Sequence, residues 1–237
     1  MPILIDWNLS LTTEHVLRAQ GADPEIIRSR RPSLIKTADW ALREGLPLLN
    51  PRVLFQQYSV KSLAHERLEI YDELTNKNQH YLSGPLIAQH LGPAEKIIVM
   101  ICTIGKDLEE IASELMSTEP LRGFALDSVG SAASEMLAIQ ACNYFEAEAL
   151  TDGLQTTLPL NPGMIGWSVR DGQPQIFNLL DSREINVSLN ADCMMSPQKS
   201  LSLVLGIGPN AATSGQVCDY CSLNGICKYQ NHYAKQA

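Results

Sequence analysis

The fold is decided by residues 121–150, which read LRGFALDSVGSAASEMLAIQACNYFEAEAL. The stretch contains no proline. Its apolar side chains, among them Leu126, Val129, Ala133 and Leu137, recur at the spacing of one face of an α-helix. This pattern predicts a single helix of about eight turns, at roughly 3.6 residues a turn. We expect a helix of this length to run through the middle of a domain.

Small residues crowd the first half of this predicted helix. Six of the seven residues from 128 to 134 are Gly, Ala or Ser, so another backbone or a flat ligand could approach closely. Asp127, Ser131 and Glu135 are spaced four apart and therefore share one side of the helix. Two interpretations stay open, a ligand site and close helix packing with solvated carboxylates. Spacing alone favours the second.

The chain before this helix mixes helices and strands. Residues 1–50 predict a short strand at 3–5 followed by three helices, which we treat as a helical layer. From position 52 to position 70, β-branched and aromatic residues favour strands. Residues 96–103, KIIVMICT, form a nearly continuous apolar run, as expected for a strand buried on both faces.

A turn between this strand and the next predicted helix could bind an anion. Thr103 and Gly105 lie in the turn, and a helix that begins at such a turn exposes free backbone N–H groups. A tight turn in which the glycine serves backbone geometry is at least as good an interpretation.

After the long helix, the loop 156–166, TTLPLNPGMIG, is rich in Pro and Gly. A short helix at 173–180 and strands at 185–189, 192–195 and 200–207 follow, the last with leucines that alternate as if one face were buried. Strands on both sides of the central helices predict an α+β fold. We divide the chain into residues 1–50, an α+β domain at 51–212, and a tail at 213–237.

Composition limits the classes of function. The chain has 237 residues, of which 45% are hydrophobic and 19% charged, as in an ordinary globular protein. Its net charge of −8 argues against a nucleic-acid surface. The N-terminus, MPILIDW, lacks the features of a signal peptide, and no apolar run approaches the roughly 18 residues of a spanning helix. We expect a cytoplasmic protein that binds neither nucleic acid nor membrane.

The tail carries the most specific chemical pattern, a Cys-x2-Cys-x5-Cys motif formed by Cys218, Cys221 and Cys227. Three cysteines at this density in a turn-rich segment of a reduced compartment predict a metal site. Sulfur ligands indicate zinc or an iron–sulfur cluster. With His232 as the fourth ligand the set is typical of structural zinc, and with Cys193 a four-cysteine cluster is possible. Cys102 and Cys142 are interpreted as core residues.

Taken together, several collinear segments resemble the reactivation domain of cobalamin-dependent methionine synthase in a stand-alone form. They are IIVMICTIG at 97–105, LDSVGSAASEMLA at 126–138, NPG at 161–163, QPQIFNLLD at 173–181, MMSPQKSLS at 194–202 and GIG at 206–208. The resemblance implies a curved antiparallel sheet flanked by helices, with the long helix at its centre.

Function is implied by the same resemblance. Such a domain binds S-adenosylmethionine and caps the corrinoid of a partner, so that reduced cobalt can take the sulfonium methyl group. By position, Glu135 matches an acidic residue that contacts S-adenosylmethionine, and Pro162, Gly163 and Met164 line the same site. Lys199, in the SPQKS turn, is a further candidate that could face a phosphate or carboxylate.

The chain departs from the family pattern at the ligand loop. The family loop reads Arg-x-x-Pro-Gly-Tyr, whereas Pro159 and Met164 stand here in place of the Arg and the Tyr. Losing a charge-assisted partner in a polar site costs about 1.5–3 kcal/mol. The cysteine tail resembles those of stand-alone relatives near corrinoid methyltransferases rather than the methionine synthase domain itself.

Three functions follow as hypotheses. The first is an accessory protein that docks on a corrinoid protein or a cobalamin-dependent methyltransferase and supports reductive reactivation of its cobalt, with a 4Fe–4S cluster favoured over zinc. The second is a non-catalytic corrinoid-protein binding module with a structural zinc tail. The third is methyl transfer from S-adenosylmethionine, which the altered loop makes the least favoured.

Overall fold

The computed structural model describes residues 1–21, 23–72, 79–211 and 215–226. Within these residues one antiparallel sheet of seven strands runs in the order β4-β3-β2-β5-β9-β6, with β1 beside β2. The strands of this sheet are β1 (Ile3–Leu4), β2 (Arg52–Ala64), β3 (Arg67–Tyr71), β4 (Gln79–Ser83), β5 (Lys96–Thr103), β6 (Gln155–Thr156) and β9 (Ser200–Gly208). A small hairpin pairs β7 (Ser188–Leu189) with β8 (Met195–Ser196).

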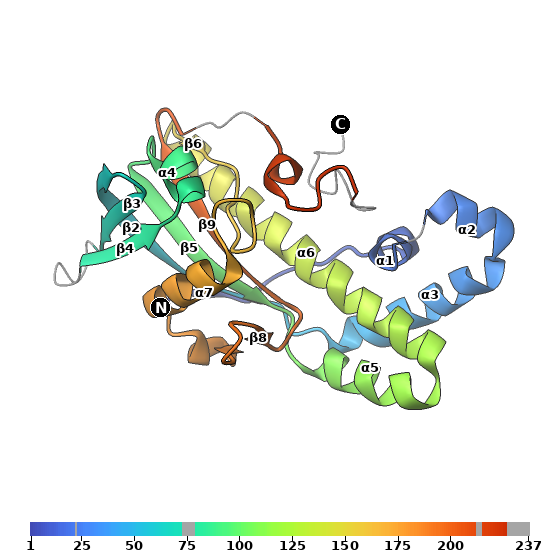
Figure 1. Cartoon of the computed structure of the whole chain (residues 1–237). Helices are drawn as coiled ribbons and strands as arrows, with labels where there is room; N and C mark the ends of the chain where they lie inside the picture. Colours follow the sequence, from blue (N-terminus) through green and yellow to red (C-terminus); the bar gives the residue numbers. More distant parts are fainter. Residues whose placement is uncertain (22, 73–78, 212–214, 227–237) are drawn as a thin grey trace.

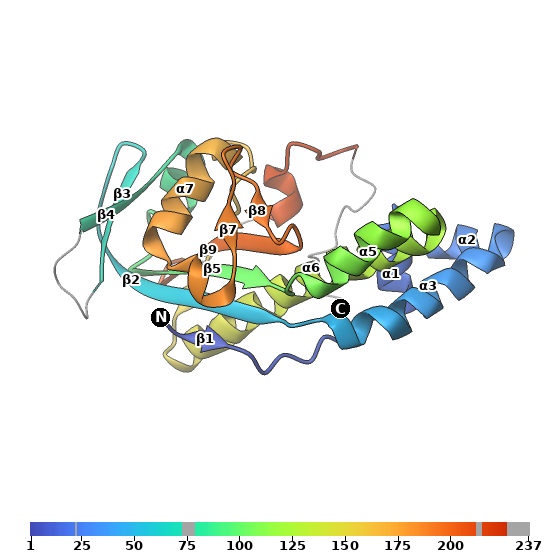
Figure 2. The ribbon, with the colours of Figure 1, turned by 90° about the horizontal axis from the view of Figure 1, so that it is seen from below.

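Helices flank both faces of the sheet. They are α1 (Thr13–Ala19), α2 (Pro24–Arg30), α3 (Pro32–Gly45), α4 (Pro85–Leu91), α5 (Asp107–Thr118), α6 (Pro120–Thr151) and α7 (Val169–Leu179). Short 3-10 helices are η1 (Leu46–Leu48), η2 (Ser182–Ile185) and η3 (Val217–Tyr220). Figure 2 shows α7 on one side of the sheet and α6 on the other. The α+β class predicted from the sequence is confirmed.

Two hydrophobic cores lie on opposite faces of the sheet. The first joins α1, α3, α5 and α6 to side chains of β2, β5 and β9 such as Met100 and Leu203. The second joins α4, α7 and the loop before α7 to the alternate side chains of the same strands, such as Val99 and Val204. The face of β9 that was predicted to be buried is buried, and the opposite face of the strand is buried as well. Leucines at every second position predict one buried face, but they carry no information on whether other elements also bury the residues between them.

The long helix α6 contacts most of the other elements that form the first core. It packs on α1, α3, α5, β5, β6 and β9, and Figure 1 shows it running diagonally from beside β6 to α5. Two of its glycines stand where another chain segment comes close. A Cβ at Gly123 would lie 2.6 Å from the backbone nitrogen of Met116 in α5, and a Cβ at Gly130 would lie 2.8 Å from Leu108 and 3.1 Å from Lys199. The small residues thus serve close packing.

Most predicted elements form, with differences at their ends. The strand at 96–103 appears where the sequence placed it, and helix α1 begins after Thr12, whose side chain accepts the backbone N–H of His15. Helix α7 begins four residues earlier than predicted because Ser168 caps it, and Pro174 lies inside it. Strand β4, which the pattern did not predict, pairs with β3.

The edge strand β4 is closed by a side chain at one point. The amide group of Gln175 in α7 accepts the backbone N–H of Ser83 at 2.8 Å and donates to the backbone carbonyl of Ser83 at 3.3 Å. A primary amide carries the same donor and acceptor pair as a peptide group, so Gln175 takes the place of a neighbouring strand there.

No helix among the described residues combines the length and the apolar character that crossing a membrane requires.

Substitution by alanine should affect stability differently at the two glycines of α6. Gly123→Ala should lower the free energy of unfolding by about 1–3 kcal/mol, because the new methyl group meets the backbone of α5. Gly130→Ala meets the ends of flexible side chains and gains about 0.5–1 kcal/mol of helix propensity, so its net change should be much smaller. Urea unfolding of both variants measures the difference, and equal costs would contradict the packing described here.

Candidate functional site

The polar face of α6 is held by a lysine from the start of β9. Lys199 Nζ donates to a carboxylate oxygen of Asp127 at 2.8 Å and to Ser131 Oγ at 2.9 Å. The Lys199 side chain is 14% exposed and crosses the helix at Gly130. Three of the predicted site residues are therefore brought together, but the lysine charge is balanced by Asp127. The Lys199 ammonium group, which was predicted to face a phosphate or carboxylate of a ligand, is engaged here by Asp127 and Ser131. Glu135 lies half-buried one turn further along α6.

The turn after β5 is closed within itself. Thr103 Oγ1 accepts the backbone N–H of Gly105 at 3.2 Å and the hydroxyl of Ser200 at 2.9 Å. Gly105 has a φ of +82°, and its Cα faces Asn50. This arrangement favours the tight-turn interpretation of Thr103 and Gly105 over an anion site, because the glycine N–H already has an acceptor.

The predicted ligand loop lies along the edge of β9. Leu160 pairs with Val204 as a single bridge, and the Asn161 amide donates to the Ser202 carbonyl at 3.4 Å. Lys199, which contacts Asp127 of α6, directly precedes the same strand, so the loop and α6 both make contacts along β9. The structure thus places Leu160 and Asn161 beside β9, whereas Pro162 lies against Gly172 and Gly163 bonds to Trp167.

Met164 points inward, where the family has Tyr. Its side chain is 8% exposed and belongs to the second core, and its sulfur accepts the Asn161 N–H at 3.2 Å. The loop is tightened by Gly163 N–H donating to the Trp167 carbonyl at 2.7 Å and Trp167 N–H donating to the Met164 carbonyl at 3.0 Å. Met164 therefore supplies backbone and core packing, and an aromatic contact to a ligand is absent at this position.

An open cavity of about 960 Å³ lies beside this loop. It is lined by Gly163 to Asp171, by the ends of β3 and β4, and by Ser222 of the tail. Arg67 stands at its rim with the guanidinium 3.4 Å above the ring of Tyr81. Sequence reasoning missed this cavity because its walls come from segments far apart in the chain.

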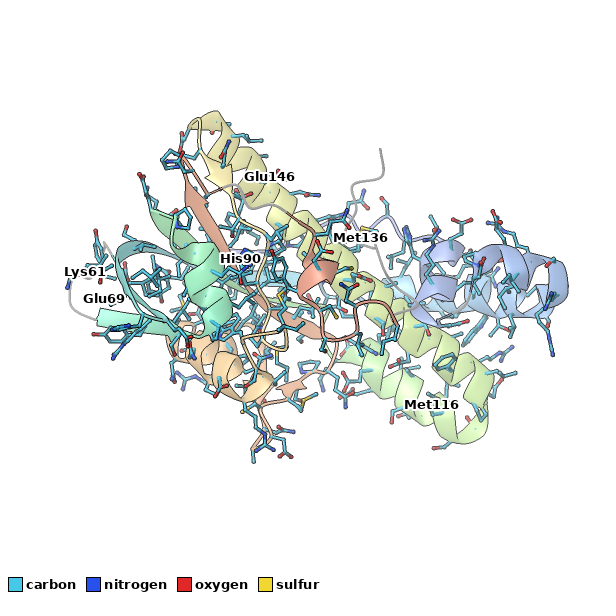
Figure 3. The ribbon with its side chains drawn as sticks, turned by 45° about the horizontal axis from the view of Figure 1, so that its top comes forward. Lys61, Glu69, His90, Met116, Met136 and Glu146 are labelled. Carbon is cyan, nitrogen blue, oxygen red and sulfur yellow. The ribbon has the colours of Figure 1, made fainter. Side chains whose placement is uncertain are left out.

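The tail segment 215–226 is docked on the domain. Val217 and Tyr220 pack against the second core, and the Tyr220 carbonyl accepts the Ile165 N–H at 2.9 Å. The Tyr220 ring meets His90 edge-on, with ring centroids 4.5 Å apart. Figure 3 marks His90 on α4, near η3. A docked tail was not predicted, although a tyrosine between two cysteines was visible in the sequence.

Two of the predicted metal ligands lie in this segment. Cys218 and Cys221 are half-buried free thiols, and Cys221 Sγ accepts the Leu223 N–H at 3.5 Å. Cys227 and His232 lie outside the described residues. Among the described residues no group of three or more potential ligands forms a metal site, so Cys193 does not join the pair. Cys193 lies in the β7–β8 hairpin, which Figure 1 separates from η3.

Cys102 and Cys142 have thiols whose pKa values are raised by burial. Burial raises the pKa of Cys102 well above its usual range and that of Cys142 to about 12. Thiols of this kind stay protonated and unreactive at neutral pH, in line with their predicted role as core residues.

Comparisons with known proteins show the fold. No protein-family model and no curated protein sequence matches the chain. One matching solved structure is described as the crystal structure of the MetH reactivation domain bound to AdoHcy. It is 14% identical in sequence with a TM-score of 0.71, and the match covers 91% of this chain and 81% of that chain. The predicted resemblance in fold to a methionine synthase reactivation domain is confirmed.

The Lys199–Asp127 pair should contribute measurably to stability. In a double-mutant cycle with Lys199→Met and Asp127→Asn, we expect a coupling of about 1 kcal/mol or more, because the lysine is largely buried and has two acceptors. The exposed pair Lys106 and Glu110 is the matched control, with an expected coupling of about 0.3–0.5 kcal/mol. Equal couplings in urea unfolding would rule out a special role for Lys199.

His90 should make stability depend on pH. Burial lowers its pKa, and its two ring nitrogens have no hydrogen-bond partner among the described residues. The unfolded chain takes up a proton below about pH 6.5 while the folded chain resists it. This contribution to stability is therefore complete above about pH 6.5 and is lost as the pH falls below it. His90→Leu should flatten the decline seen in urea unfolding between about pH 6.5 and 5, whereas His65→Asn, at an exposed position, should leave it unchanged.

Proposed function

We propose that this protein is a cytoplasmic accessory factor of a corrinoid-dependent methyltransferase system, which docks on a corrinoid protein and supports reductive reactivation of its cobalt. The observation that carries the proposal is the shared fold with a reactivation domain, over 91% of this chain. That neighbour is described with AdoHcy bound. A fold that presents a loop and a helix face beside one strand suits capping of a large flat ligand.

The ligand loop supports docking more than direct methyl transfer. Pro159 cannot supply the cation expected of the family loop, and Met164 is turned into the core. The acid Asp127 is already paired with Lys199. We therefore place a nucleoside thioether such as AdoHcy, or its methylated form, against Glu135, Pro162 and Gly163 as a secondary ligand. The main role assigned to this surface is contact with the corrinoid carrier.

The tail supplies the electron chemistry in this proposal. Thiolates of Cys218, Cys221 and Cys227 would hold a 4Fe–4S cluster. Such a cluster would supply one electron for the reduction of cob(II)alamin to cob(I)alamin on the partner, and a low-potential flavin or iron–sulfur protein would reduce the cluster again. Cob(I)alamin then takes a methyl group from the methyl donor. Ser222 lines the same cavity as the ligand loop, so the tail stands beside the surface assigned to docking.

Binding to a corrinoid carrier tests the docking role. Ile165 is 60% exposed on the ligand loop, and Ile165→Asp should weaken the complex with a purified carrier about tenfold or more in titration calorimetry. Leu150, also 60% exposed but at the end of α6, provides the control Leu150→Asp, which should bind like the parent. Equal effects of both changes, or a protein that binds no corrinoid carrier, would refute the docking role.

Metal content separates the electron-transfer role from a structural tail. Protein purified without oxygen should be brown and contain iron and acid-labile sulfide, and mixing with the carrier should shift its cobalt spectrum. A colourless protein with bound zinc and firm carrier binding would instead support the non-catalytic module. Tight binding of S-adenosylmethionine with no partner present would support direct methyl transfer.

A further inference from the structure

His90 is a buried histidine whose two ring nitrogens have no hydrogen-bond partner among the described residues. It lies in the last turn of α4, on the same side of the helix as Leu86 and Ile87, which belong to the second core. An imidazolium ring at this position would carry a charge and two N–H donors without an acceptor for either. The structure around His90 therefore strongly favours the neutral ring.

The tail segment 215–226 lies against this histidine. Tyr220 meets the His90 ring edge-on, and Val217 packs against the same core. The Tyr220 carbonyl also accepts the Ile165 N–H, so the segment contacts both α4 and the ligand loop. None of the residues from 215 to 226 is buried. A segment with so little buried surface can detach at a much lower free-energy cost than unfolding of the whole domain.

Strands β3 and β4, which pack on α4, bring no balancing charge to His90. Their side chains on the α4 side are apolar, apart from His80, whose ring packs against Tyr58 with centroids 5.8 Å apart. Their other titratable side chains alternate onto the opposite face of the sheet and are Arg67, Glu69, Tyr71 and Tyr81. Strand β9, which also packs on α4, has no titratable residue.

The tail brings three titratable groups to this region, Cys218, Asp219 and Tyr220 of η3. The Asp219 carboxylate already accepts the Gln216 N–H at 2.7 Å. Burial is the cause of the lowered pKa of His90, without a contribution from a neighbouring charge of the described residues. Exposure of the ring to water is therefore what would restore its ordinary affinity for a proton.

We propose that protonation of His90 releases the tail segment from the domain, so that the segment is a pH-controlled cover of the ligand loop. Once the segment has detached, the ring can reach water, and the Ile165 N–H loses its acceptor. The docked state binds the proton less well than the released state, so release becomes more favourable as the pH falls below about 6.5. Docking is at full strength above that pH. The inference rests on the proposed function in that the loop is taken as the docking surface.

Hydrogen exchange of the Ile165 amide in the full chain measures release of the tail. Its protection factor, corrected for the ordinary pH dependence of amide exchange, should be constant above about pH 6.5 and fall about fivefold or more by about pH 5. Met100, in the central strand β5, is the reference for unfolding of the whole domain. Ile165 should exchange much faster than Met100 at every pH, because only the tail has to detach.

Variants at the contact separate release of the tail from other effects of pH. His90→Leu should keep Ile165 protected down to about pH 5, and Tyr220→Ala should leave it weakly protected at every pH, because His90 is then no longer covered. Tyr220→Phe, which keeps the ring, should behave like the parent. His65→Asn is the matched control, since His65 is exposed, and it should retain the parent's decline.

Three outcomes would overturn the inference. They are an Ile165 protection factor that stays constant from about pH 7.5 to 5, the same decline in His90→Leu as in the parent, and protection of Ile165 equal to that of Met100, which would mean that the tail leaves only when the domain unfolds. No corrinoid carrier is present in these measurements, so failure here is distinguishable from failure of carrier docking.

Discussion

Close approach along α6 is the constraint on which the rest of the structure depends. At Gly123 the helix touches the backbone of α5, and at Gly130 it leaves room for Lys199 to cross from β9. Lys199 then joins the strand to Asp127 and Ser131. A larger residue at Gly123 would push α5 outward, because the packed interior leaves no room for an added methyl group there.

Much of the fold could be predicted because the pattern of neighbouring residues is enough to specify several of its helices and strands. Proline-free periodicity marks α6, and an unbroken Ile and Val run marks β5, which pairs on both sides. The edge strand β4 has too little apolar pattern to be seen, and the start of α7 depends on the cap at Ser168. Burial of the second face of β9 depends on α7 and the loop before it, which no window of sequence near β9 contains.

The site was less predictable, for physical reasons that differ from residue to residue. Asp127, Ser131 and Lys199 were identified as polar residues, but only the structure shows that they satisfy one another. The inward turn of Met164 follows from its place in the second core, which the motif does not encode. His90 and Tyr220 come together from positions that are distant in the chain, and the spacing of the cysteines gives no sign of this contact.

The amide of Gln175 on Ser83 affects how copies of this protein meet one another. An edge strand with free N–H and C=O groups is a template on which another chain can add a strand, and such pairing leads to aggregation. At Ser83 both groups are already occupied by a side chain from the protein's own α7. At this point of β4 the backbone groups of Ser83 are therefore not available to pair with a strand of a second copy.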